Sequence, residues 1–163
     1  MQGGHRMSVL LGIDPGNTTG WCFITDRGVV ECGVFPVAAH SLEVFDHPIY
    51  QPDQVIFEHP QAYRPGESKG NPNDLHGMVF QVGRWWQYYG ATYRSKLRWI
   101  HPAEWKGQLN KDVCAARVWS LLTTEEQLVV SRCGKGLAKK PMLDMMDAVG
   151  IALFGVGRKI KYV

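Results

Sequence analysis

The chain has 163 residues, of which 45% are hydrophobic and 20% are charged, a balance that excludes disordered and collagen-like classes. Its formal net charge of +3 is compatible with a polyanionic partner without requiring one. No stretch approaches the run of about 18 apolar residues that a membrane-spanning helix needs. We expect a flexible tail over residues 1–7 and a single domain over residues 8–163.

The four cysteines stand apart in the sequence, without a CxxC pair and without a secretory segment before them. This pattern favours reduced thiols and a cytoplasmic location.

The first part of the chain is predicted to form strands. Residues 8–14 are an apolar run closed by Pro-Gly, as in a strand buried on both faces. Residues 21–26 and 29–35 have the character of two further strands joined by a turn. Residues 37–53 are ambiguous because prolines limit any helix there. Residues 54–58 return to strand character.

A loop, a long helix and a fifth strand are predicted next. Residues 60–73 contain three prolines and two glycines, which favours a loop. From Asp74, an N-cap residue, apolar side chains recur at helical spacing as far as Gly90. Residues 91–100 then alternate like a strand.

Helices are predicted for the last third of the chain. We expect two short ones around residues 103–121 and 124–132, the second opening with the capping-box pattern TEEQ from Thr124. A final helix over residues 141–158 has Pro141 in its first turn. Three strands in series, then strand, helix, strand and helices, indicate a mixed α/β domain with an antiparallel and a parallel half.

Acidic residues stand at the ends of two predicted strands and on the last helix. Asp14 ends the first strand and Glu58 ends the fourth, so the two carboxylates lie side by side if these strands are neighbours. Asp144 and Asp147 are three residues apart, on one face of a largely apolar helix. Singly, each has a structural explanation, such as an Asx-turn or a helix cap. Grouped, they need a cation, and an all-oxygen set selects Mg²⁺ or Mn²⁺.

Three segments resemble the acidic motifs of the RuvC family of Holliday-junction resolvases, within the RNase H-like superfamily. They are LLGIDPGNTTGW, VIFEHP and DMMDAVGIAL, and they match in type, spacing and order over most of residues 8–155. The resemblance implies an RNase H-like α/β fold with a five-stranded mixed sheet of order 3-2-1-4-5 flanked by helices. It also implies that two Mg²⁺ or Mn²⁺ ions are held by Asp14, Glu58, Asp144 and Asp147.

Two lysines belong to a fourth similar segment. HPAEWK followed by KDV resembles the family's proline-plus-lysine segment, which implies that Lys106 and Lys111 approach the scissile phosphate. Four residues separate these lysines, where the family has a longer Gly-rich insert. An ordinary lysine at the start of a helix is therefore an alternative for Lys111.

The predicted DNA contacts lie outside the acidic motifs. The family has an aromatic wedge three residues after the acidic strand end, where this chain has Gln61. Tyr63 is expected to unstack the junction centre in its place, or else to be an ordinary loop aromatic. Contacts to DNA phosphates, which would weaken with salt, are expected from Arg64, Lys69, Lys96, Lys135, Lys139, Lys140 and Arg158.

The long helix predicted from Asp74 carries more apolar surface than a monomer of this size leaves exposed, including Trp85-Trp86 and Tyr88-Tyr89. In the resembled family the corresponding helix forms a dimer. A homodimer with two active sites related by a two-fold axis would suit a junction with two strands to cut.

We therefore expect a metal-dependent endonuclease that resolves Holliday junctions or other branched DNA by phosphodiester hydrolysis. One alternative keeps the fold but acts on flaps, R-loops or RNA, or only binds them. A second alternative is a nucleotide-binding domain, because GIDPGNTTG also resembles the phosphate hairpin of sugar kinases and actin-type ATPases. Such proteins need a second lobe and a second phosphate hairpin that this chain lacks, so no nucleotide cofactor is expected.

Overall fold

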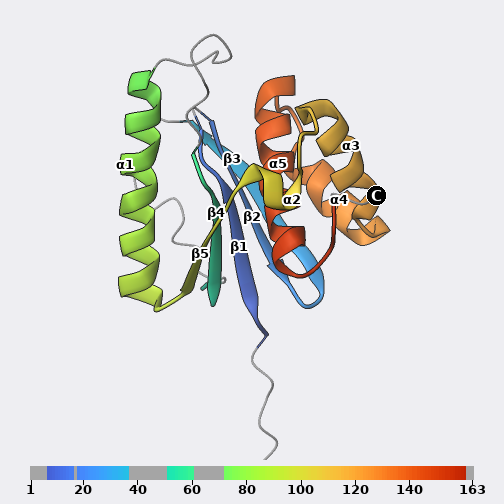
Figure 1. Cartoon of the computed structure of the whole chain (residues 1–163). Coiled ribbons are helices and arrows are strands. Elements are labelled where there is room, and N and C mark those ends of the chain that lie inside the picture. The colour runs from blue at the N-terminus through green and yellow to red at the C-terminus, as the bar shows by residue number, and fades with distance from the viewer. Residues whose placement is uncertain (1–6, 17, 37–50, 61–71, 161–163) are drawn as a thin grey trace, which may run out of the picture.

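The computed structural model describes residues 7–16, 18–36, 51–60 and 72–160. Within these residues the chain forms three layers: one long helix, a five-stranded sheet and a group of four helices (Figure 1).

The sheet has the predicted strand order. Its strands are β1 (Val9–Asp14), β2 (Thr18–Thr25), β3 (Gly28–Pro36), β4 (Gln54–Glu58) and β5 (Lys96–Ile100). They lie in the order β3-β2-β1-β4-β5. The β3, β2 and β1 strands pair antiparallel, whereas β4 pairs parallel with β1 and with β5. The predicted mixed sheet with an antiparallel and a parallel half is confirmed.

Helices cover both faces of the sheet. On one face lies α1 (Pro72–Tyr88), whose Val82 and Trp85 pack on Leu11 and Phe57 of the strands. On the other face lie α2 (Pro102–Trp105), α3 (Lys111–Leu121), α4 (Thr124–Cys133) and α5 (Lys139–Gly155) (Figure 1). The central strand β1 is buried along its whole length, as expected of a strand covered on both faces.

Two glycines bring α5 against the sheet. A Cβ atom on Gly12 would lie 2.8 Å from the carbonyl oxygen of Ala148, and one on Gly20 would collide with the carbonyl oxygen of Asp144. Any larger residue at these two positions would push the helix away. The glycines therefore determine how closely the acidic residues of α5 approach the strands.

The predicted fifth strand is shorter than expected. Residues 89–93 extend α1 by a π-helical turn, η2 (Tyr89–Tyr93), and β5 begins only at Lys96. The rings of Tyr88, Tyr89 and Tyr93 pack on one another, which stabilises the extra turn. Arg94, in the left-handed conformation with φ of 54°, then reverses the chain.

Several helix boundaries also differ from the predictions, and α5 runs over Lys139–Gly155 instead of residues 141–158. The long helix begins at Pro72, two residues before Asp74. The helix expected over residues 103–121 is divided into α2 and α3, because Gly107 takes a left-handed φ of 64° and Asn110 caps a new helix by accepting a hydrogen bond from Val113. The capping box uses Thr123 and Glu126, one residue earlier than predicted. No helix in the described part of the chain is long and apolar enough to cross a lipid bilayer.

Candidate active site

Two carboxylates meet at one edge of the sheet. The parallel strands β1 and β4 are paired through Ile13 and Phe57, so the next residues along each strand, Asp14 and Glu58, stand beside each other at the carboxyl ends. In open α/β sheets this edge is where ligands bind. The strand pairing therefore places these two acids side by side, as expected if the two strands are neighbours.

The helix α5 brings two further carboxylates to the same edge. Asp144 and Asp147 lie on one face of α5, and both are buried, Asp147 with only 1% of its surface exposed. The position of Asp144 depends on Gly20, whose missing side chain leaves room for the Asp144 backbone. Buried carboxylates are costly without compensating partners.

The compensating partners are the two predicted lysines. Lys106 Nζ lies 3.1 Å from Asp147 Oδ2 and 3.3 Å from Glu58 Oε2. Lys111 Nζ lies 2.6 Å from Asp144 Oδ1, 3.3 Å from Asp147 Oδ2 and 3.9 Å from Asp14 Oδ2. The structure thus brings all six residues proposed for catalysis into one network of charges, with Asp147 at its centre.

The surroundings of Asp14 and Glu58 disfavour the ionised form of both side chains. Burial, and then the charges of Glu58 and Asp147, raise the pKa of Asp14 well above its ordinary value. Burial likewise raises the pKa of Glu58, although Lys106 opposes this change. Burial alone would lower the pKa of Lys106, but the nearby carboxylates outweigh it and the pKa is raised. Four carboxylates against two ammonium groups leave an excess of negative charge that favours additional cations.

The donor atoms suit a hard divalent cation, provided that a lysine moves. As arranged here, no three acidic, histidine or cysteine side chains of the described residues are placed to hold a metal ion, and ammonium groups lie among the carboxylates. Yet Asp147 Oδ1 is buried and accepts no hydrogen bond from the described residues. Lys111 is 48% exposed and can turn outward, whereas Lys106 is only 12% exposed. Carboxylate oxygens are the ligands that Mg²⁺ and Mn²⁺ prefer.

Sequence reasoning did not identify Trp105, which contacts two members of the network. Its Nε1 donates a hydrogen bond of 2.7 Å to Glu58 Oε2, and its ring lies under Lys106 Nζ. The only signal in the sequence is its place directly before Lys106. Cys114 was also missed; burial first, and then the charge of Asp147, raise the pKa of its thiol to about 12.

Solved structures similar to this one include three Holliday junction resolvases. Thermus thermophilus RuvC in complex with a Holliday junction substrate is 18% identical, with a TM-score of 0.52 over 93% of this chain and 97% of that chain. The yeast mitochondrial resolvase Ydc2 is 20% identical, with a TM-score of 0.63 over 89% and 76%. The fowlpox virus resolvase with its junction is 13% identical, with a TM-score of 0.55 over 90% and 95%.

The chain has the RNase H-like fold of the RuvC-type resolvases. In sequence, no protein-family model matches it, and no functionally curated protein is similar to it. The described residues build a single sheet, and the expected absence of a nucleotide cofactor stays a prediction.

Three of the predicted DNA contacts, Tyr63, Arg64 and Lys69, lie outside the described residues. Lys135, Lys139 and Lys140 are exposed around the start of α5, where Lys139 forms an ion pair of 2.8 Å with Asp112. Lys96 pairs with Gln54 at the opposite end of the sheet from Glu58, so it is remote from the acidic cluster.

Arg158, expected to contact a DNA phosphate, forms an ion pair within the protein. The Arg158 guanidinium donates two hydrogen bonds to Glu126, of 2.6 and 2.9 Å, and Glu126 is almost completely buried. Glu126 also accepts a hydrogen bond from the backbone N–H of Val29 on β3. Arg158 therefore ties the chain after α5 to α4 and the sheet, with 30% of its side chain still exposed.

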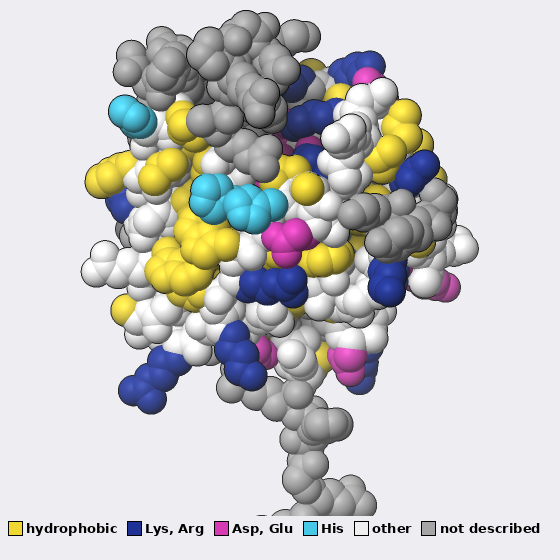
Figure 2. All heavy atoms as spheres, viewed as in Figure 1, with side chains coloured by type: hydrophobic (Ala, Val, Ile, Leu, Met, Phe, Trp, Pro, Cys, Tyr) yellow, Lys and Arg dark blue, Asp and Glu magenta, His cyan; other side chains and the backbone are white. Residues whose placement is uncertain are grey.

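Two exposed histidines flank the acidic edge. His59 follows Glu58 directly, and its ring centroid lies 4.9 Å from that of His101. Trp99 lies beside His59 and stacks on Trp86. Figure 2 shows histidine side chains next to hydrophobic side chains on this face of the molecule. The two histidine rings contact each other, and His59 also contacts Trp99, which favours a structural role for both histidines.

Proposed function

We propose that this protein is a metal-dependent endonuclease that resolves Holliday junctions or other branched DNA by phosphodiester hydrolysis. The observation that carries the proposal is the convergence of Asp14, Glu58 and Asp147 with two lysines, at the carboxyl edge of a sheet whose fold is that of Holliday junction resolvases.

Mg²⁺ or Mn²⁺ is the proposed cofactor, with two ions per active site. The cluster divides into two halves that would hold them, since Glu58 and Asp147 surround Lys106 whereas Asp14, Asp144 and Asp147 surround Lys111. Bound there, the ions would lower the pKa of a water molecule and stabilise the charge of the leaving oxygen.

The acidic residues and Lys111 have different roles in the proposed hydrolysis. Hydrolysis joins a water oxygen to phosphorus and breaks the bond to the 3′-oxygen, leaving a 5′-phosphate and a 3′-hydroxyl. Asp14, Glu58 and Asp147 stand on β1, β4 and α5 and would supply carboxylate oxygens to the ions from these rigid elements. Lys111, half-exposed on the first turn of α3, can exchange Asp144 for a phosphate oxygen of the DNA, which would orient the backbone for attack.

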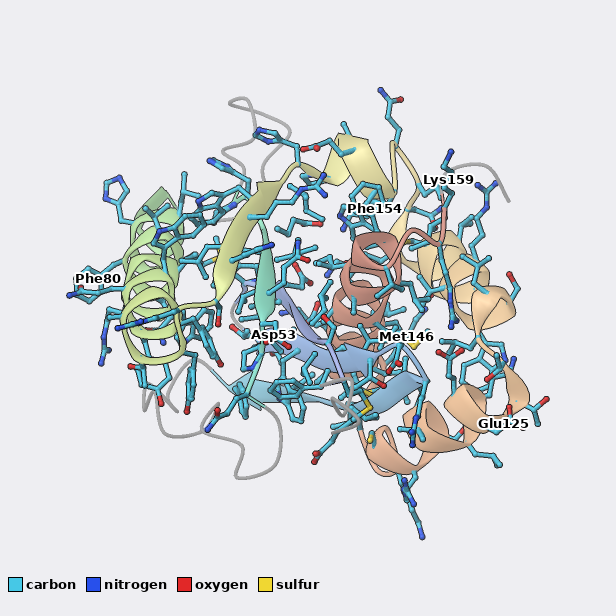
Figure 3. All side chains as sticks on the ribbon, turned by 90° about the horizontal axis from the view of Figure 1, so that it is seen from below. Asp53, Phe80, Glu125, Met146, Phe154 and Lys159 are labelled. Atoms are coloured by element: carbon cyan, nitrogen blue, oxygen red, sulfur yellow. The ribbon has the colours of Figure 1, made fainter. Side chains whose placement is uncertain are left out.

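A homodimer formed through α1 is the proposed assembly. Val79 and Phe80 are exposed on α1, Phe80 to 71%, and Figure 3 shows Phe80 projecting away from the sheet. The opposite face of the same helix is buried through Val82 and Trp85. An apolar face left uncovered on a helix suits a second copy of the chain, and two copies would supply one active site for each strand to be cut.

The proposal is tested on a four-way junction, a flap, an R-loop and a linear duplex, each with Mg²⁺, with Mn²⁺ and with chelator. Three proteins are compared: wild type, Asp14→Asn, and the control Asp26→Asn, which alters an exposed acid in the turn between β2 and β3. We expect wild type and the control to cut the junction in the presence of metal, and Asp14→Asn to be inactive. Equal cutting by all three would reject the catalytic cluster, and preferential cutting of the flap or R-loop would replace the junction as substrate.

A further inference from the structure

We propose that Trp105 is a positioning residue that holds Glu58 and Lys106 at a fixed spacing within the acidic cluster. It touches both groups, by its indole N–H on one side and by its ring face on the other. The inference rests on the proposed function only in that the cluster binds a divalent ion.

The indole itself is firmly held. Trp105 is completely buried, and its ring lies against α5 at Gly150, where any side chain would collide with it. Its backbone belongs to the short helix α2, in which the N–H of Lys106 bonds to the carbonyl of Pro102 at 2.9 Å. A side chain packed this closely keeps one rotamer, so the direction of its N–H is fixed.

The N–H sets the orientation of the Glu58 carboxylate. An indole can donate one hydrogen bond and accept none, so it engages Glu58 without competing for a cation. The bond of 2.7 Å goes to Oε2, which leaves Oε1 as the atom through which Glu58 would hold an ion. Removing a partner that fixes a metal ligand in this way commonly weakens metal affinity about 10- to 100-fold.

The ring face holds the second group. Lys106 Nζ lies 4.7 Å from the ring centroid, a distance at which an ammonium ion is attracted to the π face. This contact holds Lys106 Nζ on one side. On the other side, Lys106 is held by its hydrogen bond to Asp147 and its ion pair with Glu58. The same residue therefore determines where the carboxylate and the neighbouring positive charge stand relative to each other.

Two replacements of Trp105 separate its N–H from its bulk. Trp105→Phe removes the N–H and part of the ring. Site-specific incorporation of benzothienylalanine keeps the shape and the π face but has sulfur in place of the N–H. The matched control is Trp85→Phe, which makes the same change at a buried tryptophan on the other face of the sheet.

The measurement is Mn²⁺ affinity, by electron paramagnetic resonance of the free ion, on folded protein without DNA. Junction affinity in chelator and the kcat and KM for cleavage are measured alongside. We expect both Trp105 replacements to bind Mn²⁺ about tenfold more weakly or worse and to lower kcat, with junction affinity unchanged. Trp85→Phe should keep wild-type Mn²⁺ affinity.

Wild-type Mn²⁺ affinity in the benzothienylalanine protein would overturn the inference, as would a failure of the wild-type protein to bind Mn²⁺. Equal weakening in Trp85→Phe would also overturn it, because the effect would then be one of general stability. If wild type binds Mn²⁺ and the Trp105 replacements weaken it, but no DNA is cut, the positioning role stands and the proposed nuclease function fails.

Discussion

Replacing Lys106 by methionine tests whether the ammonium groups stabilise the metal-free cluster. Methionine retains most of the side-chain volume but removes the charge that lies 3.1 Å from Asp147 and 3.3 Å from Glu58. Removing one partner of a buried ion pair costs about 3–5 kcal/mol, because the remaining charge is left uncompensated. In a chain of this size that loss corresponds to a fall in Tm of about 10 °C.

The assay is thermal unfolding at mildly alkaline pH, where the carboxylates are ionised, in chelator and again with Mg²⁺. A ligand that binds only the folded state at 100 times its Kd restores about 2.7 kcal/mol, so Mg²⁺ should recover a large part of the lost stability in Lys106→Met. The control is Lys140→Met, which removes an exposed lysine and should change Tm little. An unchanged Tm for Lys106→Met in chelator would refute the reasoning.

Three further predictions concern assembly, the packing of α5 on the sheet and the pH dependence of stability. Phe80→Glu should give a folded monomer by sedimentation velocity, whereas Leu128→Glu, at a residue 68% exposed on α4, should remain a dimer. Gly20→Ala should cost about 1–3 kcal/mol or more in urea unfolding because its Cβ meets the Asp144 carbonyl, whereas Gly77→Ala, with nothing nearby, should gain up to about 1 kcal/mol. The pKa of Asp14 is raised in the folded protein, so its contribution to stability is present at low pH and is lost as pH rises through that pKa. In chelator at neutral pH, Asp14→Asn should therefore have a higher Tm than wild type. This difference in Tm should disappear on acidification.

Local patterns were sufficient to predict the strands and the acidic residues that end two of them. A continuous apolar run that ends in Asp14 predicts a doubly buried strand, and a second run predicts the strand that ends in Glu58. That these two strands are neighbours followed only from the resemblance to the RuvC family. The three-residue spacing of Asp144 and Asp147 places both on one helical face whatever the rest of the fold does. These features depend on periods of two and 3.6 residues, which a sequence displays directly.

The remaining features depend on contacts between distant residues. The bond from Trp105 to Glu58 joins residues 47 positions apart, and nothing around either residue indicates it. The pairing of Arg158 with Glu126 likewise depends on how α4 and α5 pack, so no pattern in the sequence indicates it. The extra turn over Tyr89–Tyr93 requires aromatic packing that overrides the alternating pattern of residues 91–100.

The sharing of Asp147 Oδ2 by both ammonium groups, at 3.1 and 3.3 Å, links the two halves of the cluster. When one lysine leaves that oxygen, the other gains a larger part of its charge and is held more firmly. The two halves of the metal-free cluster are therefore coupled, so a replacement at one lysine also changes how firmly the other lysine is held.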